Sequence, residues 1–232
     1  MVSPDDSNTK RQLRPQREAS RFAPEPRWPA IVAALAAGGL YTAMPQGLSV
    51  GPPWMLALAV AVLVVPSVVS HRAGRHDVNR FVGFVIEGLL TLGMIWSLAM
   101  LIRALVTHGE APGALLRSAA LLWGANVLVF SLWYWRLDAG GPHGRDREPG
   151  HHVGAFLFPQ MTAEGAAAAG EAEAEWSPQF IDYLFIAFNT STAFSPTDTP
   201  VLSRWAKGLV MVQSLISLTT IAILVGRAVN IL

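Results

Sequence analysis

The sequence predicts an all-α membrane protein with about five transmembrane helices and one re-entrant half-helix. Of its 232 residues, 52% are hydrophobic and only 14% are charged, a composition too apolar for an ordinary soluble domain. Several apolar runs have the length that a helix needs to cross a hydrocarbon core, roughly 20 residues. One further run, residues 183–188, is far too short to cross, and it leads directly into a polar segment.

The composition also argues against several classes of function. The formal net charge is only +1, whereas a nucleic-acid-binding protein needs a basic field. Cysteine is absent, so neither disulfides nor thiolate metal sites can form. His71 and His76 are spaced so that they do not share one helical face, and the adjacent His151 and His152 point to different faces. We therefore expect no metal site, no cofactor and no nucleic-acid partner.

The first 135 residues predict a tail and a region of four membrane helices. Residues 1–27 are polar and basic and lack apolar periodicity, which is typical of a disordered tail. Four apolar runs follow within residues 28–135, and a charged turn at residues 71–80 separates the second from the third. The predicted helices cover residues 28–44, 54–70, 81–106 and 115–135.

Two polar residues fall inside these helices, Glu87 in the third and Asn126 in the fourth. An ionisable group in a membrane segment is costly, so Glu87 is by default a candidate functional residue. The structural alternative is that Glu87 lies close enough to the interface to reach water or to pair with Arg80 or Arg103. Asn126 is expected to form a hydrogen bond with Glu87 across a helix pair.

The rest of the chain predicts a polar connecting loop, residues 136–176, and a re-entrant hairpin followed by the last membrane helix, residues 177–232. Ser177 and Pro178 are favourable residues for the start of the half-helix. Membranes tolerate non-helical backbone at depth only where protein buries it or where it lines a water-filled cavity. The predicted turn of the hairpin comprises Thr190, Ser191, Thr192, Ala193, Phe194, Ser195, Pro196, Thr197 and Asp198.

The last helix gathers its polar residues on one stripe. Gln213, Ser217 and Thr220 recur at steps of four and three residues, which places them on the same helical face. A polar stripe on a membrane helix is expected to face inward, toward either a seam of the helix bundle or an aqueous path. The sequence leaves packing seam and pore lining as equal alternatives.

The order of these parts resembles the pore module of tetrameric potassium channels, in which an outer helix, a pore helix, a filter and an inner helix follow one another. The segment from Asn189 to Asp198 stands where that family carries its filter. The resemblance implies a homotetramer, a monovalent cation as the permeating ion, and a hairpin that enters from outside the cell. The family's filter contains glycines, whereas this chain has none between Gly170 and Gly208, so potassium selectivity is not implied.

The whole chain also resembles a group of bacterial multi-pass membrane proteins. That resemblance implies no particular activity. It rests on four stretches: the residues from Trp133, Tyr134 and Trp135 to Gly141 and Pro142; residues 158–161; the turn at residues 192–198; and residues 227–230.

The distribution of basic residues predicts the orientation. All of the 17 Lys and Arg residues except Arg103, Arg117 and Arg227 fall on one side of the predicted helices, and this side is therefore expected to be cytoplasmic. The N-terminus then lies in the cytoplasm, and the richness in alanine and arginine suggests the inner membrane of a bacterium. The hairpin would enter from the cytoplasmic side, which conflicts with the potassium-channel resemblance, and we give the charge distribution more weight.

Two functions are compatible with these observations. The first is an oligomeric, channel-like cation pore in the lipid bilayer, with Asp198 forming a ring of charge at its mouth. The second is a non-conducting membrane scaffold or partner subunit with a degenerate pore loop. An enzyme is not expected, because Glu87, Asp182 and Asp198 are isolated carboxylates without a nucleophile, a metal cluster or a nucleotide loop beside them.

Overall fold

The computed structural model describes residues 25–107, 111–147, 154–162, 176–195 and 198–231, and the described residues are predominantly helical. Apart from short 3₁₀ turns, the only pairing between extended segments in the described part is an isolated antiparallel bridge between Phe156 and Val201. The α-helices are α2 (Trp28–Thr42), α3 (Trp54–Arg72), α4 (His76–Thr107), α5 (Pro112–Leu137), α6 (Gly141–Arg147), α8 (Phe180–Ala193) and α9 (Arg204–Ile231).

Four of these helices, α3, α4, α5 and α9, are long and apolar enough to cross a membrane. Helix α2 is also apolar, but its 15 residues span only about 22 Å, less than the roughly 30 Å of a hydrocarbon core. The protein is therefore an all-α, multi-pass membrane protein. The expected fifth crossing corresponds to this shorter helix.

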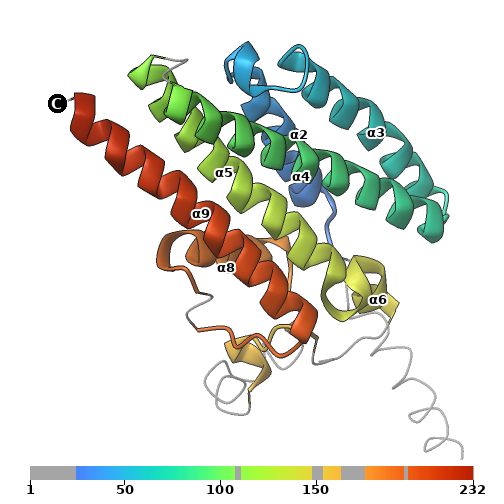
Figure 1. Ribbon diagram of the computed structural model, residues 1–232. Coiled ribbons are helices and arrows are strands. Elements are labelled where there is room, and N and C mark those ends of the chain that lie inside the picture. Colours follow the sequence, from blue (N-terminus) through green and yellow to red (C-terminus); the bar gives the residue numbers. More distant parts are fainter. Residues whose placement is uncertain (1–24, 108–110, 148–153, 163–175, 196–197, 232) are drawn as a thin grey trace, which may run out of the picture.

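Helix α5 lies at the centre of the bundle. It packs against α2, α4, α8 and α9, whereas α3 packs on the outside against α2 and α4. Figure 1 shows α9 and α3 on opposite sides of this arrangement. Four residues along α5, Leu115, Leu122, Ala125 and Val129, are fully buried, so its apolar surface forms much of the core.

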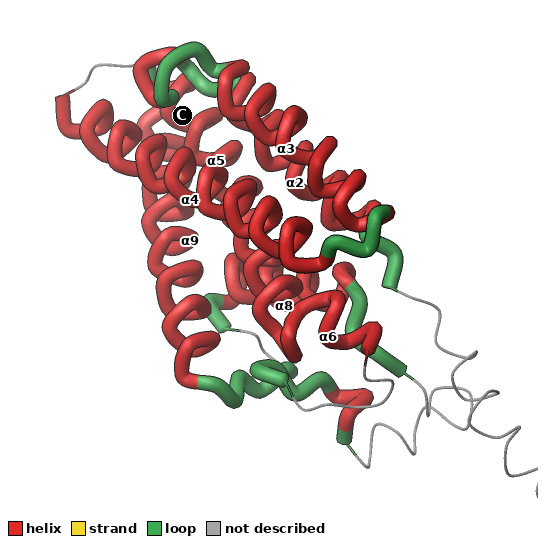
Figure 2. The backbone as a smooth tube through the Cα atoms, turned by 90° about the vertical axis from the view of Figure 1, so that its right-hand side faces the viewer, coloured by secondary structure: helices red, strands yellow, loops and turns green. Residues whose placement is uncertain are grey.

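One end of the bundle carries most of the described basic residues, and we call it the charged end. The starts of α2, α4 and α9 and the ends of α3 and α5 meet there, because successive long helices run in opposite directions. Figure 2 shows α6 and α8 near this same end. The opposite end, which we call the far end, holds the turn between α2 and α3 and the connection between α4 and α5.

The predicted charged turn at residues 71–80 is wrong in extent. Helix α3 continues through Arg72 and α4 already begins at His76, five residues before the predicted start. Gly74 adopts a positive φ of 68°, which lets the chain leave α3 abruptly, and Asp77 is favourable in the first turn of α4. Helix α5 likewise begins at Pro112, three residues earlier than predicted.

The predicted start and end of the half-helix are also corrected. Helix α8 begins at Phe180, and its N-cap is Gln179, which forms a capping box with Asp182, so Ser177 is not the cap. The helix continues through Ala193. Thr190, Ser191, Thr192 and Ala193 therefore belong to its last turn, and the non-helical segment starts at Phe194, which has a left-handed conformation with φ of 58°.

Candidate functional site

Helix α8 enters the bundle from the charged end and stops in its interior. Phe180, its first residue, packs edge-on against Trp135, and Phe188, two turns further, packs against Trp123, with ring centroids 5.9 and 6.0 Å apart. Since Trp135 and Trp123 are separated by about 18 Å along α5, α8 runs antiparallel to α5 from the charged end toward the middle. The end of α8 therefore lies beside the middle of α5.

The chain returns from α8 to the same end. After the turn, Pro200 accepts a hydrogen bond from Leu157 N at 3.0 Å, and Leu202 N donates to Ala155 O at 2.8 Å. These residues lie just before the first turn of α9, next to the segment that follows α6. Helix α8 and the return segment, which we call the hairpin, therefore begin and end at the same end of the bundle, the arrangement expected of a re-entrant segment (Figure 1).

Asp138 anchors the base of the hairpin, a role that the sequence analysis missed. Its buried carboxylate accepts hydrogen bonds from the Tyr183 hydroxyl, at 2.7 Å, and from the backbone N–H of Ala155. Phe156 is fully buried against the rings of Tyr134 and Tyr183. The only sequence signal was that Asp138 follows closely on the aromatic residues 133–135 at the end of a predicted membrane helix. The predicted connecting loop, residues 136–176, thus contains a segment around Ala155 and Phe156 that packs against the end of the bundle.

The first turn of α8 is stabilised by its own acidic residue. The carboxylate of Asp182 accepts a hydrogen bond from Gln179 N at 2.8 Å, which completes the capping box. Burial raises the pKa of Asp182 above its ordinary value, and the hydrogen bond from Gln179 opposes that rise. Asp182 therefore has a structural role in the capping box of α8.

Gln213 of α9 joins three helices within the bundle. Its side-chain N–H groups donate to Ala187 O at 2.7 Å and to Ser191 Oγ at 2.9 Å, both on α8. Its side-chain oxygen accepts from the hydroxyl of Tyr134 on α5 at 2.5 Å. Gln213, Tyr134 and Ser191 are all fully buried, so this cluster is isolated from solvent.

The last turn of α8 is held by further donors. Ser191 O accepts from Ser217 Oγ at 2.5 Å and from Trp123 Nε1 at 3.3 Å. Asn126 donates from its amide nitrogen to Ser191 Oγ and to Gln213 O, each at 3.3 Å. The predicted hydrogen bond between Asn126 and Glu87 is therefore wrong, because both residues have other partners.

The remaining residues of the predicted turn have different environments. Thr190 is fully buried, whereas Thr192 is exposed and its hydroxyl donates back to its own helix, to Phe188 O at 3.0 Å. Phe194 is 42% exposed, and its carbonyl accepts from Ser214 Oγ at 3.3 Å. Ala193, Ser195 and Asp198 are exposed, while Pro196 and Thr197 lie outside the described residues.

The polar stripe of α9 faces the inside of the helix bundle. Gln213, Ser217 and Thr220 are each fully buried, and the hydroxyl of Thr220 donates to the carbonyls of Ile216 and Ser217 in its own helix. Of the two alternatives that the sequence leaves open, the geometry of the single chain corresponds to a packing seam. A lining role would require α9 to separate from α5 and α8.

Glu87 lies in a network of charges at the charged end. It is 1% exposed and pairs with Arg136, the residue after Trp135, so the predicted partners Arg80 and Arg103 are wrong. Nearby, Arg145 donates to the carboxylate of Glu25 at 2.8 Å. Other members of the network are Arg27, which pairs with Asp146, and Trp135, whose indole N–H donates to Glu25 at 2.5 Å.

Three histidines meet at this end. The ring of His143 on α6 lies with its centroid 4.4 Å from that of His76 and 5.5 Å from that of His71. His143 Nε2 is also 3.0 Å from the side-chain oxygen of Asn79. Among the described residues, no group of three or more His, Cys, Asp or Glu side chains has a geometry that could hold a metal ion.

Fold and contacts together define the class: a multi-pass α-helical membrane protein with the hairpin packed into its own bundle and a charged network at one end. Comparison with known proteins adds no narrower assignment. No protein-family model, no curated protein and no solved structure matches the chain.

Proposed function

We propose that this protein is a non-conducting subunit of the bacterial inner membrane, with its N-terminus in the cytoplasm, and that its re-entrant hairpin is a sealed packing element. The observation that carries this proposal is the hydrogen bonding of Ser191. Its carbonyl accepts from Ser217 and Trp123, and its hydroxyl contacts Gln213 and Asn126, all within one protomer.

These contacts matter because a conducting pore loop offers its oxygens to the ion. Carbonyl and hydroxyl oxygens along such a loop replace the hydration shell of the permeating ion. In this protein both side-chain and main-chain oxygens of Ser191 are engaged by α5 and α9, and the carbonyl of Phe194 accepts from Ser214, whereas the buried hydroxyl of Thr190 has no partner among the described residues. Opening them toward an axis would leave several buried polar groups without partners, each costing about 1–3 kcal/mol.

The outer surface of the hairpin supports the same conclusion. The exposed large side chains of α8 and of the facing part of α9 are apolar, which suits lipid or a membrane helix of another subunit. A path between copies of the chain would therefore have apolar walls on this side. These side chains are Ile181, Phe185, Phe188, Met211, Val212, Leu215 and Leu218.

The second candidate function, a homotetrameric cation pore, is favoured by a different observation. Helix α8 ends in the membrane interior, so its C-terminal dipole places partial negative charge there, as a cation path would require. Asp198 is exposed on the return segment at the charged end. In this alternative the copies would meet around the hairpins and Asp198 would form a ring at the mouth.

Cation flux from liposomes distinguishes the two candidates. The purified protein is reconstituted into liposomes loaded with a cation-sensitive dye, together with the variants Phe194→Gly and Asp198→Asn. We expect no flux above that of empty liposomes for all three proteins, because the seal lies in the hydrogen-bonded seam and does not depend on Phe194. Flux through the unmodified protein that falls in Asp198→Asn would establish the cation pore instead.

A further inference from the structure

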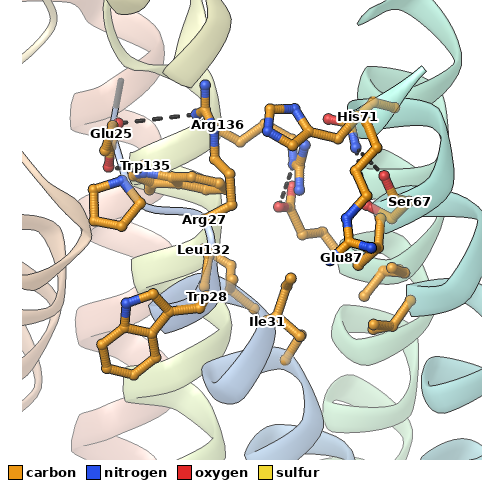
Figure 3. A pocket seen from close by; sticks show the side chains of 18 residues that line it. Glu25, Arg27, Trp28, Ile31, Ser67, His71, Glu87, Leu132, Trp135 and Arg136 are labelled. Carbon is orange, nitrogen blue, oxygen red and sulfur yellow. Dashed lines mark hydrogen bonds and ion pairs between the residues drawn. The ribbon is translucent and has the colours of Figure 1, made fainter. Parts of the chain in front are cut away.

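A cavity of about 360 Å³ lies at the charged end, between α2, α3, α4 and α5 (Figure 3). Its size falls at the lower end of the range of roughly 300–1,000 Å³ found for small-molecule sites. The hairpin on α8 and α9 contributes no residue to its wall. The cavity is therefore separate from the site on which the proposed function rests.

The wall of the cavity is divided into a polar part and an apolar part. On α2, Arg27 stands at the outer end and Ala34 lies about 10 Å deeper, and on α3, Arg72 stands at the outer end and Val64 lies about 12 Å deeper. The outer wall also contains His71, Asn79 and Arg136, and the inner wall contains Ile31, Val68, Ile86 and Leu132, with Ser67 and the Arg136-paired Glu87 as its polar members. A ligand that fits both parts has a polar head and a hydrocarbon chain.

The charges of the wall favour an anionic head. Three guanidinium groups, from Arg27, Arg72 and Arg136, face two carboxylates, from Glu25 and Glu87. Arg136 pairs with Oε1 of Glu87, whose Oε2 is buried without a hydrogen bond to the described residues, and Glu25 is engaged by Arg145 and Trp135. Arg27 pairs with Asp146 through Nη2, and its Nη1 lies 4.0 Å from Oε2 of Glu25, but its buried Nε and Nη1 make no hydrogen bond to the described residues. These are donors that require an acceptor.

We propose that this cavity binds a phosphate-bearing amphiphile, with the phosphate at Arg27 and Arg72 and one hydrocarbon chain along Ile31, Ala34 and Val64. Guanidinium groups match the geometry of phosphate oxygens and form strong, charge-assisted hydrogen bonds with them. Basic pockets between membrane helices on the cytoplasmic side suit the head groups of anionic phospholipids. Glu87 acts here as a positioning residue, since it holds Arg136 in the wall.

The test uses the full-length protein in a non-ionic maltoside detergent and a soluble probe, dodecyl phosphate, titrated below its critical micelle concentration in a calorimeter. Dodecyltrimethylammonium, which carries the same chain on a cationic head, and inorganic phosphate, which carries the anion without a chain, serve as parallel probes. We expect saturable binding of dodecyl phosphate with a Kd at least tenfold lower than that of either other probe.

Three variants locate the binding. Arg27→Gln and Arg72→Gln are each expected to raise the Kd of dodecyl phosphate about tenfold, because each removes one charged donor. Arg117→Gln, which changes an exposed arginine near the far end, is the matched control and is expected to leave the Kd unchanged. Arg72 is exposed and forms no ion pair with the described residues, so Arg72→Gln remains informative if Arg27→Gln does not fold.

Each of three results would overturn the proposal. Inorganic phosphate binding as tightly as dodecyl phosphate would show a site for free phosphate and remove the lipid assignment. Dodecyltrimethylammonium binding as tightly would show that the site does not select an anionic head group and would remove the phosphate assignment. A Kd that is unchanged in both Arg27→Gln and Arg72→Gln would place any binding outside this cavity.

Discussion

At the scale of single residues, the bundle depends on a few buried polar side chains whose partners come from other helices. Gln213 is the clearest case, since its amide contacts α8 and α5 together. Helical spacing predicts that it shares a stripe with Ser217 and Thr220. Spacing could not predict its partners, because Tyr134 and Ala187 are 79 and 26 residues away in the chain.

Replacing Gln213 with leucine tests the importance of this cluster. Gln213→Leu leaves the hydroxyl of Tyr134 and the carbonyl of Ala187 without their partners, so we expect the free energy of unfolding to fall by about 1–3 kcal/mol. Thr219→Val on the same helix is the control, because the Thr219 hydroxyl bonds only Leu215 O of its own helix at 2.8 Å. Denaturant titration in detergent should show the loss in the first variant and little change in the second.

The pair of Glu87 and Arg136 makes a second prediction for single residues. Arg136→Met leaves the nearly fully buried carboxylate of Glu87 unpaired, and breaking a buried pair in this way costs roughly 3–5 kcal/mol. The double variant Glu87→Met with Arg136→Met removes both charges and should recover most of that stability. The same denaturant titration, read as a double-mutant cycle, measures the coupling. Additive losses would show that the two groups do not interact.

At the scale of elements, the contacts between helices set both the position of Arg136 and the length of α8. Gly83 lies where α4 faces Arg136, and a Cβ atom at this position would overlap the guanidinium group. A Cβ atom at Gly88, five residues further along the same helix, would meet no neighbouring side chain or helix within 4 Å. The two glycines therefore separate a packing effect from an intrinsic helix preference.

Alanine at these two positions should change stability in opposite directions. Gly83→Ala displaces Arg136 from Glu87, and we expect it to lower the free energy of unfolding by about 1–3 kcal/mol despite the better helix propensity of alanine. Gly88→Ala should raise that energy by about 0.5–1 kcal/mol, since alanine is favoured over glycine in a helix interior. Equal effects of the two substitutions in thermal or denaturant unfolding would contradict the packing that we describe.

Helix α8 was predicted from the sequence in kind but not in length. The run at residues 183–188 was too short for a crossing, and this alone predicted a half-helix, which the structure contains as α8. Its end was predicted four residues too early, because the polar residues Thr190 and Ser191 suggested a turn. Instead, burial against α5 and α9 supplies partners for Ser191 and extends the helix to Ala193. Contacts between helices that are distant in the chain cannot be predicted from the local sequence pattern.

At the scale of the whole molecule, the hairpin and the proposed amphiphile site both lie at the charged end. The hairpin enters and leaves there, and the proposed amphiphile site opens between the other helices at the same end. The asymmetry of Lys and Arg predicts that this end is cytoplasmic. The sequence could predict that a charged end exists, whereas the pairing of Glu25 with Arg145, 120 residues apart, depends on the fold.

The most direct test of a sealed, re-entrant hairpin is the accessibility of single cysteines in intact membrane vesicles, which the absence of native cysteine makes possible. Cysteines replacing Ser177 and Asp198 should react with a membrane-impermeant maleimide from the same side, and cysteines replacing Gln46 and Ala111 from the opposite side. A cysteine replacing the buried Thr190 should not react even with a small thiosulfonate. Reaction at Thr190, or labelling of Ser177 and Asp198 from opposite sides, would contradict the account.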